Sequence, residues 1–199
     1  GSNNWPGSSK IEEDGVEYAY VETTAGYMLE VSIDKVIVME DVPSKTEIAF
    51  DISIADNDEL GASAKRYRKS WYNNGAINEL WSNMEGAGGL VLQAGSSALT
   101  ITSVVALEPP VLDGKSEDAA WSGAAWNNIS VVFKGEAAGF TGADDFTGKF
   151  KAVDDGTKSY FLLDITDDIV TIDPSAHWVG DKVEIYFGLP GYNPSAGAN

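Results

Sequence analysis

The chain has 199 residues, 43% of them hydrophobic, which is enough for one generous domain or two small ones. Its 31 acidic and 13 basic residues give a formal net charge of −18. This charge disfavours nucleic acid and anionic membranes as partners, since both need a basic face, and it suits a neutral ligand or a cation. The absence of cysteine excludes disulfides and cysteine-ligated zinc. No apolar run reaches the length of a membrane span, so we expect no membrane insertion.

Period-two alternation and enrichment in β-branched and aromatic residues predict strands along the whole chain. Turn signals such as Asn73–Gly75 and Asp154–Gly156 separate them. Many short strands between such turns predict an all-β fold, an antiparallel β-sandwich or jelly roll. Helical turns are expected only within Val36–Val42 and Ser116–Trp121. In chain order, the expected strands are Glu17–Glu22, Tyr27–Ile33, Glu47–Ala55, Arg66–Trp71, Gly89–Gln93, Ala98–Val105, Ile129–Phe133, Gly148–Asp154, Ser159–Ile165 and Lys182–Phe187.

A small-residue stretch, Ala94–Ala98, divides the chain in the middle. It separates residues 1–93 from residues 105–199, with residues 94–104 as a linker and possible edge strand. Either part alone would expose a long sheet edge and bury only a thin core, so we expect both to complete one sandwich domain. Residues 188–199 and 1–10 share a Gly/Asn/Pro/Ser composition and would form one loop if joined end to end.

The motifs of both parts resemble one family. In the second part these are Pro109–Gly114, Asp118–Trp121, Gly148–Gly156, Ser159–Asp167 and Ala176–Tyr186. They resemble the N-terminal half of the family nine carbohydrate-binding modules found on xylanases and related secreted proteins. The first part resembles the C-terminal half of the same modules, through Gly26–Ile33, Ile48–Asn57, Ser70–Trp71, Asn78–Trp81 and Gly89–Leu92. The resemblance therefore covers nearly the whole chain in swapped order.

Three arrangements account for the swapped order. The chain is a circular permutant, or a fragment that spans half of each of two tandem modules, or a single module that is cut within one loop and written from that cut. Each gives a complete sandwich, within one chain or by exchange in a domain-swapped homodimer. The resemblance implies a secreted or bacterial cell-surface protein. It also implies a binding module without catalysis, attached to a carbohydrate-active enzyme or a surface protein.

In the resembled family, two tryptophans form a slot that holds one pyranose ring, because the C–H groups of the ring pack on the face of an indole. The matching positions are Trp81 and Trp178, and core packing is the alternative for each of them. Glu184 and Asn78 match the carboxylate and the amide that read sugar hydroxyls. Glu184 is opposite in phase to Val183 and Ile185, so we expect it to point away from the apolar face. The implied partner is a plant or algal polysaccharide or its oligosaccharides.

Two positions depart from the family. Its sugar-contacting arginine corresponds to Ala19, and a glutamine on the sheet corresponds to Ser53. Arg66 and Tyr20 are candidates to compensate. The departures put the ligand preference of the family in doubt, and they support an alternative function, a structural or interaction module without a sugar site.

Acidic clusters indicate a cation site. They lie at Asp164–Asp173, at Asp56–Glu59 and at Asp144–Asp145. Calcium takes six to eight oxygens from carboxylates and carbonyls, and the family commonly holds structural calcium near the strand that leads to the first slot tryptophan. Solvated turns are the alternative for any single cluster. The expected ligands are Asp167, Asp168, Asp173 and Asp181.

Catalysis is not expected, since His177 is the only histidine and no serine lies in a nucleophile-elbow motif. Similar sandwiches in electron-transfer proteins bind haem through histidine or methionine. Nothing in the sequence spacing of the candidates supports this here. They are Met28, Met39, Met84 and His177.

Overall fold

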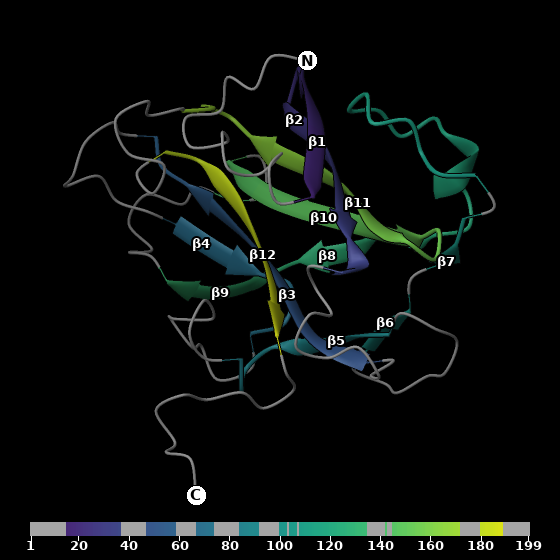
Figure 1. The fold of residues 1–199 in the computed structure, drawn as a ribbon. Helices are drawn as coiled ribbons and strands as arrows, with labels where there is room; N and C mark the ends of the chain where they lie inside the picture. The colour runs from purple at the N-terminus through teal and green to yellow at the C-terminus, as the bar shows by residue number, and fades with distance from the viewer. Residues whose placement is uncertain are drawn as a thin grey trace, which may run out of the picture.

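The computed structural model is an all-β sandwich of two six-stranded sheets, which confirms the predicted fold class (Figure 1). All strand pairs are antiparallel except two short parallel ones, β7 with β10 and β5 with β6. Within the described residues, no helix is long and apolar enough to cross a membrane. The structure describes residues 15–36, 47–58, 67–73, 84–91, 100–102, 104–106, 108–134, 142, 145–171 and 180–188.

The first sheet, sheet A, has the strand order β1-β2-β11-β10-β7, and β8 also pairs with β10. Its long central pair joins β10 to β11 through a tight turn. Its strands are β1 (Val16–Thr23), β2 (Gly26–Asp34), β7 (Val104–Val105), β8 (Asn127–Ile129), β10 (Phe146–Asp154) and β11 (Lys158–Asp167).

The second sheet, sheet B, has the strand order β6-β5-β3-β4-β9, and β12 pairs with the other side of β3. The long strand β3 therefore lies at the centre of the polar surface described below. The strands of sheet B are β3 (Glu47–Asp56), β4 (Tyr67–Ser70), β5 (Gly88–Val91), β6 (Thr100–Thr102), β9 (Val131–Lys134) and β12 (Lys182–Gly188).

Strands from distant parts of the chain alternate within both sheets. β2 pairs with β11, β3 with β12 and β4 with β9. Their inward side chains form one core in which Phe50 stacks on Phe161 and also contacts Phe150 and Phe187. The same core therefore buries apolar residues from before and after the Ala94–Ala98 stretch. The division into two half-modules in permuted order stays a prediction.

Two segments that were each predicted as one strand contain two strands, and the two strands belong to different sheets. The run Ala98–Val105 contains β6 in sheet B and β7 in sheet A, and Ile129–Phe133 is split between β8 in sheet A and β9 in sheet B. A continuous β-branched run is typical of one strand, but the chain crosses between the sheets at both places. Sequence period alone does not show such a crossing, because β-branched residues lie on both sides of it.

The outer face of sheet A is covered by residues 106–124, which we call the strap. The predicted turn within Ser116–Trp121 is a 3-10 turn (η3, Ala119–Trp121), and Trp121 is fully buried. Trp121 packs with Val153 and Leu162 of the sheet. Beneath the strap, the carboxylate of Glu30 accepts hydrogen bonds from Asp113 N (2.8 Å), Gly114 N (2.7 Å) and Trp121 Nε1 (2.9 Å).

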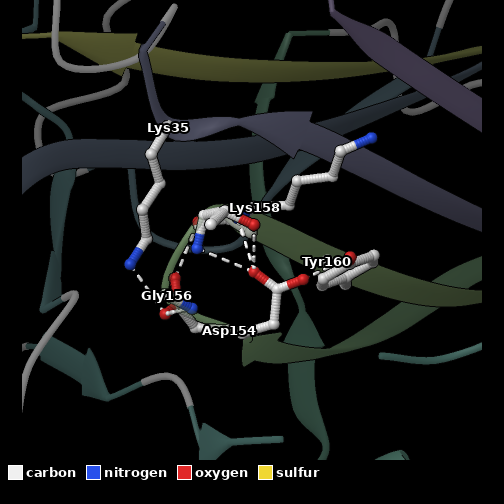
Figure 2. A network of polar contacts seen from close by, with 8 residues as sticks. Lys35, Asp154, Gly156, Lys158 and Tyr160 are labelled. Atoms are coloured by element: carbon white, nitrogen blue, oxygen red, sulfur yellow. Dashed lines mark hydrogen bonds and ion pairs between the residues drawn. The ribbon is translucent and has the colours of Figure 1, made fainter. Parts of the chain in front are cut away.

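A polar network closes the turn between β10 and β11 (Figure 2). Asp154 accepts hydrogen bonds from Lys35 Nζ (2.7 Å) and Gly156 N (2.8 Å), which ties the end of β2 to this turn. Partial burial acts to raise the pKa of Asp155. Hydrogen bonds from the Tyr160 hydroxyl and from Lys158 and Thr157 outweigh that effect and hold the pKa below its usual range. The network is a structural feature of the hairpin.

Candidate functional site

The outer face of sheet B is a row of polar side chains. Val183, Ile185 and Phe187 of β12 pack against the core, so the alternate residues of that strand face outward. This confirms the predicted orientation of Glu184. The inward residues of β3 are Phe50, Ile52 and Ile54. Apart from Ala49 and Ala55 of β3 and Gly188 of β12, the outward residues of the three strands are polar: Asp51 and Ser53 on β3, Arg68 and Ser70 on β4, and Lys182, Glu184 and Tyr186 on β12.

Glu184 is the centre of this row. Its Oε2 atom accepts hydrogen bonds from the Tyr186 hydroxyl (2.7 Å) and the Ser53 hydroxyl (3.2 Å), and it forms an ion pair with Arg68. Its Oε1 atom pairs with Lys182 Nζ at 2.6 Å. The Glu184 side chain keeps 28% of its surface exposed, so its donors orient the carboxylate without removing it from solvent.

Asp51 anchors the chain as it leaves β4. Its carboxylate is fully buried and accepts hydrogen bonds from the backbone N–H groups of Trp71 (3.1 Å), Tyr72 (3.3 Å) and Asn73 (2.7 Å). Burial raises the pKa of Asp51 to about 6, although these hydrogen bonds favour the ionised form. Asn73 has a positive φ of 29°, a conformation that asparagine tolerates better than most residues. Asp51 therefore sets the direction in which the chain enters residues 74–83.

The predicted sugar-binding residues are only partly within the described structure. Glu184 and Ser53 lie together, as direct partners in the β3–β12 register. Trp81, Trp178, Asn78 and Arg66 lie outside the described residues.

The match of Ala19 to the sugar-contacting arginine of the family is not supported by the position of Ala19. Ala19 and Tyr20 belong to β1 in sheet A, whereas Glu184 lies in sheet B. Sequence reasoning missed Arg68, Lys182 and Tyr186, which contact Glu184 directly. Arg68 and Ser70 share one face of β4, so a period-two reading of this strand could have indicated Arg68 as a neighbour of the polar row.

The chain segments that carry the two predicted slot tryptophans are anchored at opposite ends of this row. Residues 74–83 follow the Asp51 anchor, and they end at Met84, which is buried against Gly188 of β12. A Cβ atom on Gly188 would lie 2.8 Å from the Met84 Cγ, so this close approach requires glycine. Residues 172–180 end at Asp181, whose N–H donates to the Thr171 carbonyl at 2.9 Å and whose carboxylate accepts a hydrogen bond from the Thr171 N–H.

An acidic cluster lies where β3, β11 and the start of β12 meet. Asp56, Asp167 and Asp181 are buried, and each offers a carboxylate oxygen within 4.8 Å of the others. Two further groups of the same size extend the cluster and share members with the first. They are Asp56, Asp58 and Asp145, and Asp58, Asp167 and Asp168.

The electrostatics of the cluster favour a bound cation. Burial, together with neighbouring carboxylates, raises the pKa to about 7 for Asp56, about 6 for Asp167 and about 8 for Asp181. Within the described part of the chain, Asp56 Oδ1 and Asp167 Oδ2 are buried and have no hydrogen-bond partner. A buried carboxylate oxygen without a donor is costly, and a hard cation such as calcium relieves this cost. The donor set therefore fits a calcium ion.

The predicted metal ligands are partly brought together. Asp167 and Asp181 share the first group, and Asp168 shares a second group with Asp167. Asp173 lies outside the described residues. Asp56, Asp58 and Asp145 come from acidic clusters that lie far apart in the sequence. Strand pairing across more than 100 residues brings Asp56 to Asp181, and the resulting group also includes Asp58 and Asp145.

The remaining aromatic and sulfur-containing candidates are structural where they are described. Trp121 is fully buried, and the partly buried Trp71 packs on Phe50 with the ring centroids 5.7 Å apart, so both tryptophans have a structural role. Met28 packs beneath the strap on sheet A, whereas Met84 lies at the end of β12 in sheet B. The two methionines therefore do not share a haem pocket. Met39 and His177 lie outside the described residues.

The fold and this site define a β-sandwich with a polar network on the outer face of one sheet, in which the Glu184 side chain is partly exposed. The sequence model of the family described as carbohydrate family 9 binding domain-like matches residues 112–192. The expected resemblance is thereby confirmed for the part of the chain that contains Glu184, Asp167 and Asp181. This family match supports carbohydrate binding as the general function of residues 112–192, because the family consists of binding domains. Neither the comparison with curated proteins nor that with solved structures gave a match.

Proposed function

We propose that this protein is a non-catalytic module that binds plant or algal polysaccharides or their oligosaccharides. The observation that carries the proposal is the polar row on sheet B, in which a partly exposed Glu184 is oriented by Arg68, Lys182 and Tyr186. A preformed row of this kind binds hydroxyl groups with little loss of side-chain entropy. Binding to one or two sugar rings then has a Kd in roughly the micromolar to millimolar range.

In this proposal, Trp81 and Trp178 stack on the two faces of a sugar ring above the row, and Asn78 reads a further hydroxyl. The anchors described above support this arrangement. The segment with Trp81 starts and ends near Tyr186 and Gly188, and the segment with Trp178 leads directly into Asp181 and Lys182. The polar row therefore lies between the bases of the two segments.

The proposal includes a structural calcium ion. Asp56, Asp167 and Asp181 would hold it, with Asp58, Asp145 and Asp168 as further ligands, and the ion would neutralise their charge. Because Asp181 also pairs with Thr171 at the base of residues 172–180, calcium would stabilise the segment that carries Trp178. Asp173 is a further candidate ligand.

We also propose a secreted or bacterial cell-surface location and attachment to a carbohydrate-active enzyme or a surface protein. Strands from both parts of the chain pair within each sheet, so a permuted monomer and a domain-swapped homodimer are the two arrangements to be distinguished. Size-exclusion chromatography with light scattering tests this directly. A dimer at micromolar concentration would contradict the monomer.

The first test is a glycan array with the wild-type protein, followed by isothermal titration calorimetry on each hit. Binding of an uncharged glycan should be lost in Trp178→Ala and in Trp81→Ala, while thermal unfolding shows that both variants are folded. For uncharged glycans alone, Trp126→Ala is the matched control, since Trp126 lies on the other sheet next to β8. Silence across neutral plant, algal and microbial glycans would overturn the proposal and favour a structural or interaction module.

A further inference from the structure

An exposed tryptophan lies on the outer face of sheet A, away from the Glu184 row. Trp126 is 36% exposed and immediately precedes β8. The β8–β10 register pairs Asn128 with Lys149, and its continuation places Trp126 opposite Lys151. The strap ends at residue 124, so this corner of the sheet face is left open. A large aromatic side chain on an open sheet face is a characteristic platform for a ring-shaped ligand.

Two lysines lie over this indole. Lys149 Nζ is 4.7 Å and Lys151 Nζ is 5.0 Å from the centroid of the Trp126 ring. They are two positions apart on β10 and therefore face the same side, about 7 Å from each other along the strand. In a chain with 13 basic and 31 acidic residues, two cations on one exposed ring make a local positive patch on an acidic molecule.

The charges on this patch are not fully compensated by the protein. Lys149 forms an ion pair with Asp164 at 3.0 Å, where both side chains are more than one-third exposed. Lys151 donates to the Trp121 carbonyl at 2.9 Å and pairs with no carboxylate in the part of the chain that the structure describes. One ammonium group beside the indole is therefore available to an anion.

We propose that Trp126, Lys149 and Lys151 form a second binding site, which takes a carboxylated pyranose such as a hexuronate unit of an acidic polysaccharide. The sugar ring lies against the exposed part of the indole, and its carboxylate accepts hydrogen bonds from Lys151 and Lys149. Asn128, exposed beside Lys149, and Asp164 then read hydroxyl groups. This site is separate from the proposed slot on sheet B and does not depend on it.

The size and composition of the patch favour a sugar acid over other anions. Nucleic acids and anionic membranes need a broad basic face, and the net charge of −18 opposes their approach. A hexuronate carries only one carboxylate per ring, which matches one available ammonium. The indole and the neighbouring amide and carboxylate suit the C–H faces and the hydroxyl groups of the same ring.

The test is calorimetry of the full chain with defined trimers of galacturonate, guluronate, mannuronate and glucuronate, each compared with its neutral methyl ester. We expect at least one acidic trimer to bind at least tenfold more tightly than its ester, and higher salt to weaken this binding. Trp126→Ala and Lys151→Gln should each lose at least tenfold in affinity. Lys151→Arg should retain the affinity, because it keeps the charge.

Trp178→Ala separates the two sites, because it should leave binding of the acidic trimer unchanged. Thermal unfolding of each variant shows that the fold is intact. The proposal is overturned if no acidic trimer binds, if ester and acid bind equally, or if Trp178→Ala abolishes binding of the acid. Binding that is confined to sulfated oligosaccharides would also overturn it.

Discussion

The two outer faces of the sandwich each carry a glutamate, and their environments are opposite. Glu30 on sheet A is fully buried beneath the strap, where two backbone N–H groups and an indole N–H hold it. Glu184 on sheet B is held by side chains alone and stays partly exposed. Backbone donors cannot move away without loss of the fold, whereas side-chain donors can turn toward a ligand. We conclude that the Glu30 site beneath the strap is structural, whereas the side-chain donors of Glu184 are free to turn toward a ligand.

The largest effect is expected at Glu30. Glu30→Ala leaves two buried donors and one partly buried donor without an acceptor, at about 1–3 kcal/mol for each buried one, and should lower the free energy of unfolding by roughly 3–5 kcal/mol. Glu30→Gln, which keeps one acceptor oxygen, should cost less. Chemical denaturation measures both variants. A loss below 1 kcal/mol in Glu30→Ala would remove the distinction between the two faces.

Calcium should have the next largest effect, because its ligands come from both sheets. A ligand at about 100 times its Kd stabilises the folded state by about 2.7 kcal/mol, which corresponds to several degrees in Tm for a domain of this size. Thermal unfolding with added calcium and with EDTA measures this effect. Asp56→Asn is the matched variant and should abolish most of the difference. An equal Tm in calcium and EDTA would contradict the metal site.

The pH dependence of the metal-free protein should be smaller and should have an unusual sign. The pKa values of Asp167, Asp56 and Asp181 are raised to about 6, 7 and 8, so the folded state binds protons more tightly than the unfolded state. The protein in EDTA should therefore gain about 1–2 kcal/mol as the pH falls from about 8 to about 5. Calcium affinity should fall over the same window, because protons compete for the same oxygens.

Denaturation in EDTA at several pH values, with and without Asp56→Asn, measures this dependence. The variant should show a flatter profile. A steady loss of stability on acidification over this range would show that the cluster does not titrate as described.

The smallest effect on stability is expected at Glu184. Glu184→Ala removes the ion pairs of a partly exposed carboxylate with Lys182 and with the buried Arg68, and should lower the free energy of unfolding by about 1 kcal/mol. The same variant should lose at least tenfold in affinity for any neutral sugar that the array finds. Calorimetry and denaturation on one preparation measure both properties. A strongly destabilised Glu184→Ala would make the polar row structural, like the Glu30 site.

Local sequence patterns were enough to predict the all-β class and the orientation of residues within β12. Period-two alternation gave the all-β class, and the opposite phase of Glu184 to Val183 and Ile185 placed Glu184 on the outer face, because strand geometry fixes both properties locally. The structural roles of Trp71 and Trp121 were also predictable. The family resemblance was visible in the motifs of residues 109–186, and it is confirmed within residues 112–192.

Only the tertiary structure decided which strands are neighbours and which side chains meet. It split two apolar runs between the sheets, brought Arg68 to Glu184, and joined Asp56 and Asp145 to Asp167 and Asp181. It also stacked Lys149 and Lys151 on Trp126. These neighbours could not be predicted because hydrophobic burial is non-directional. A local pattern therefore shows that a face is buried without showing what lies against it.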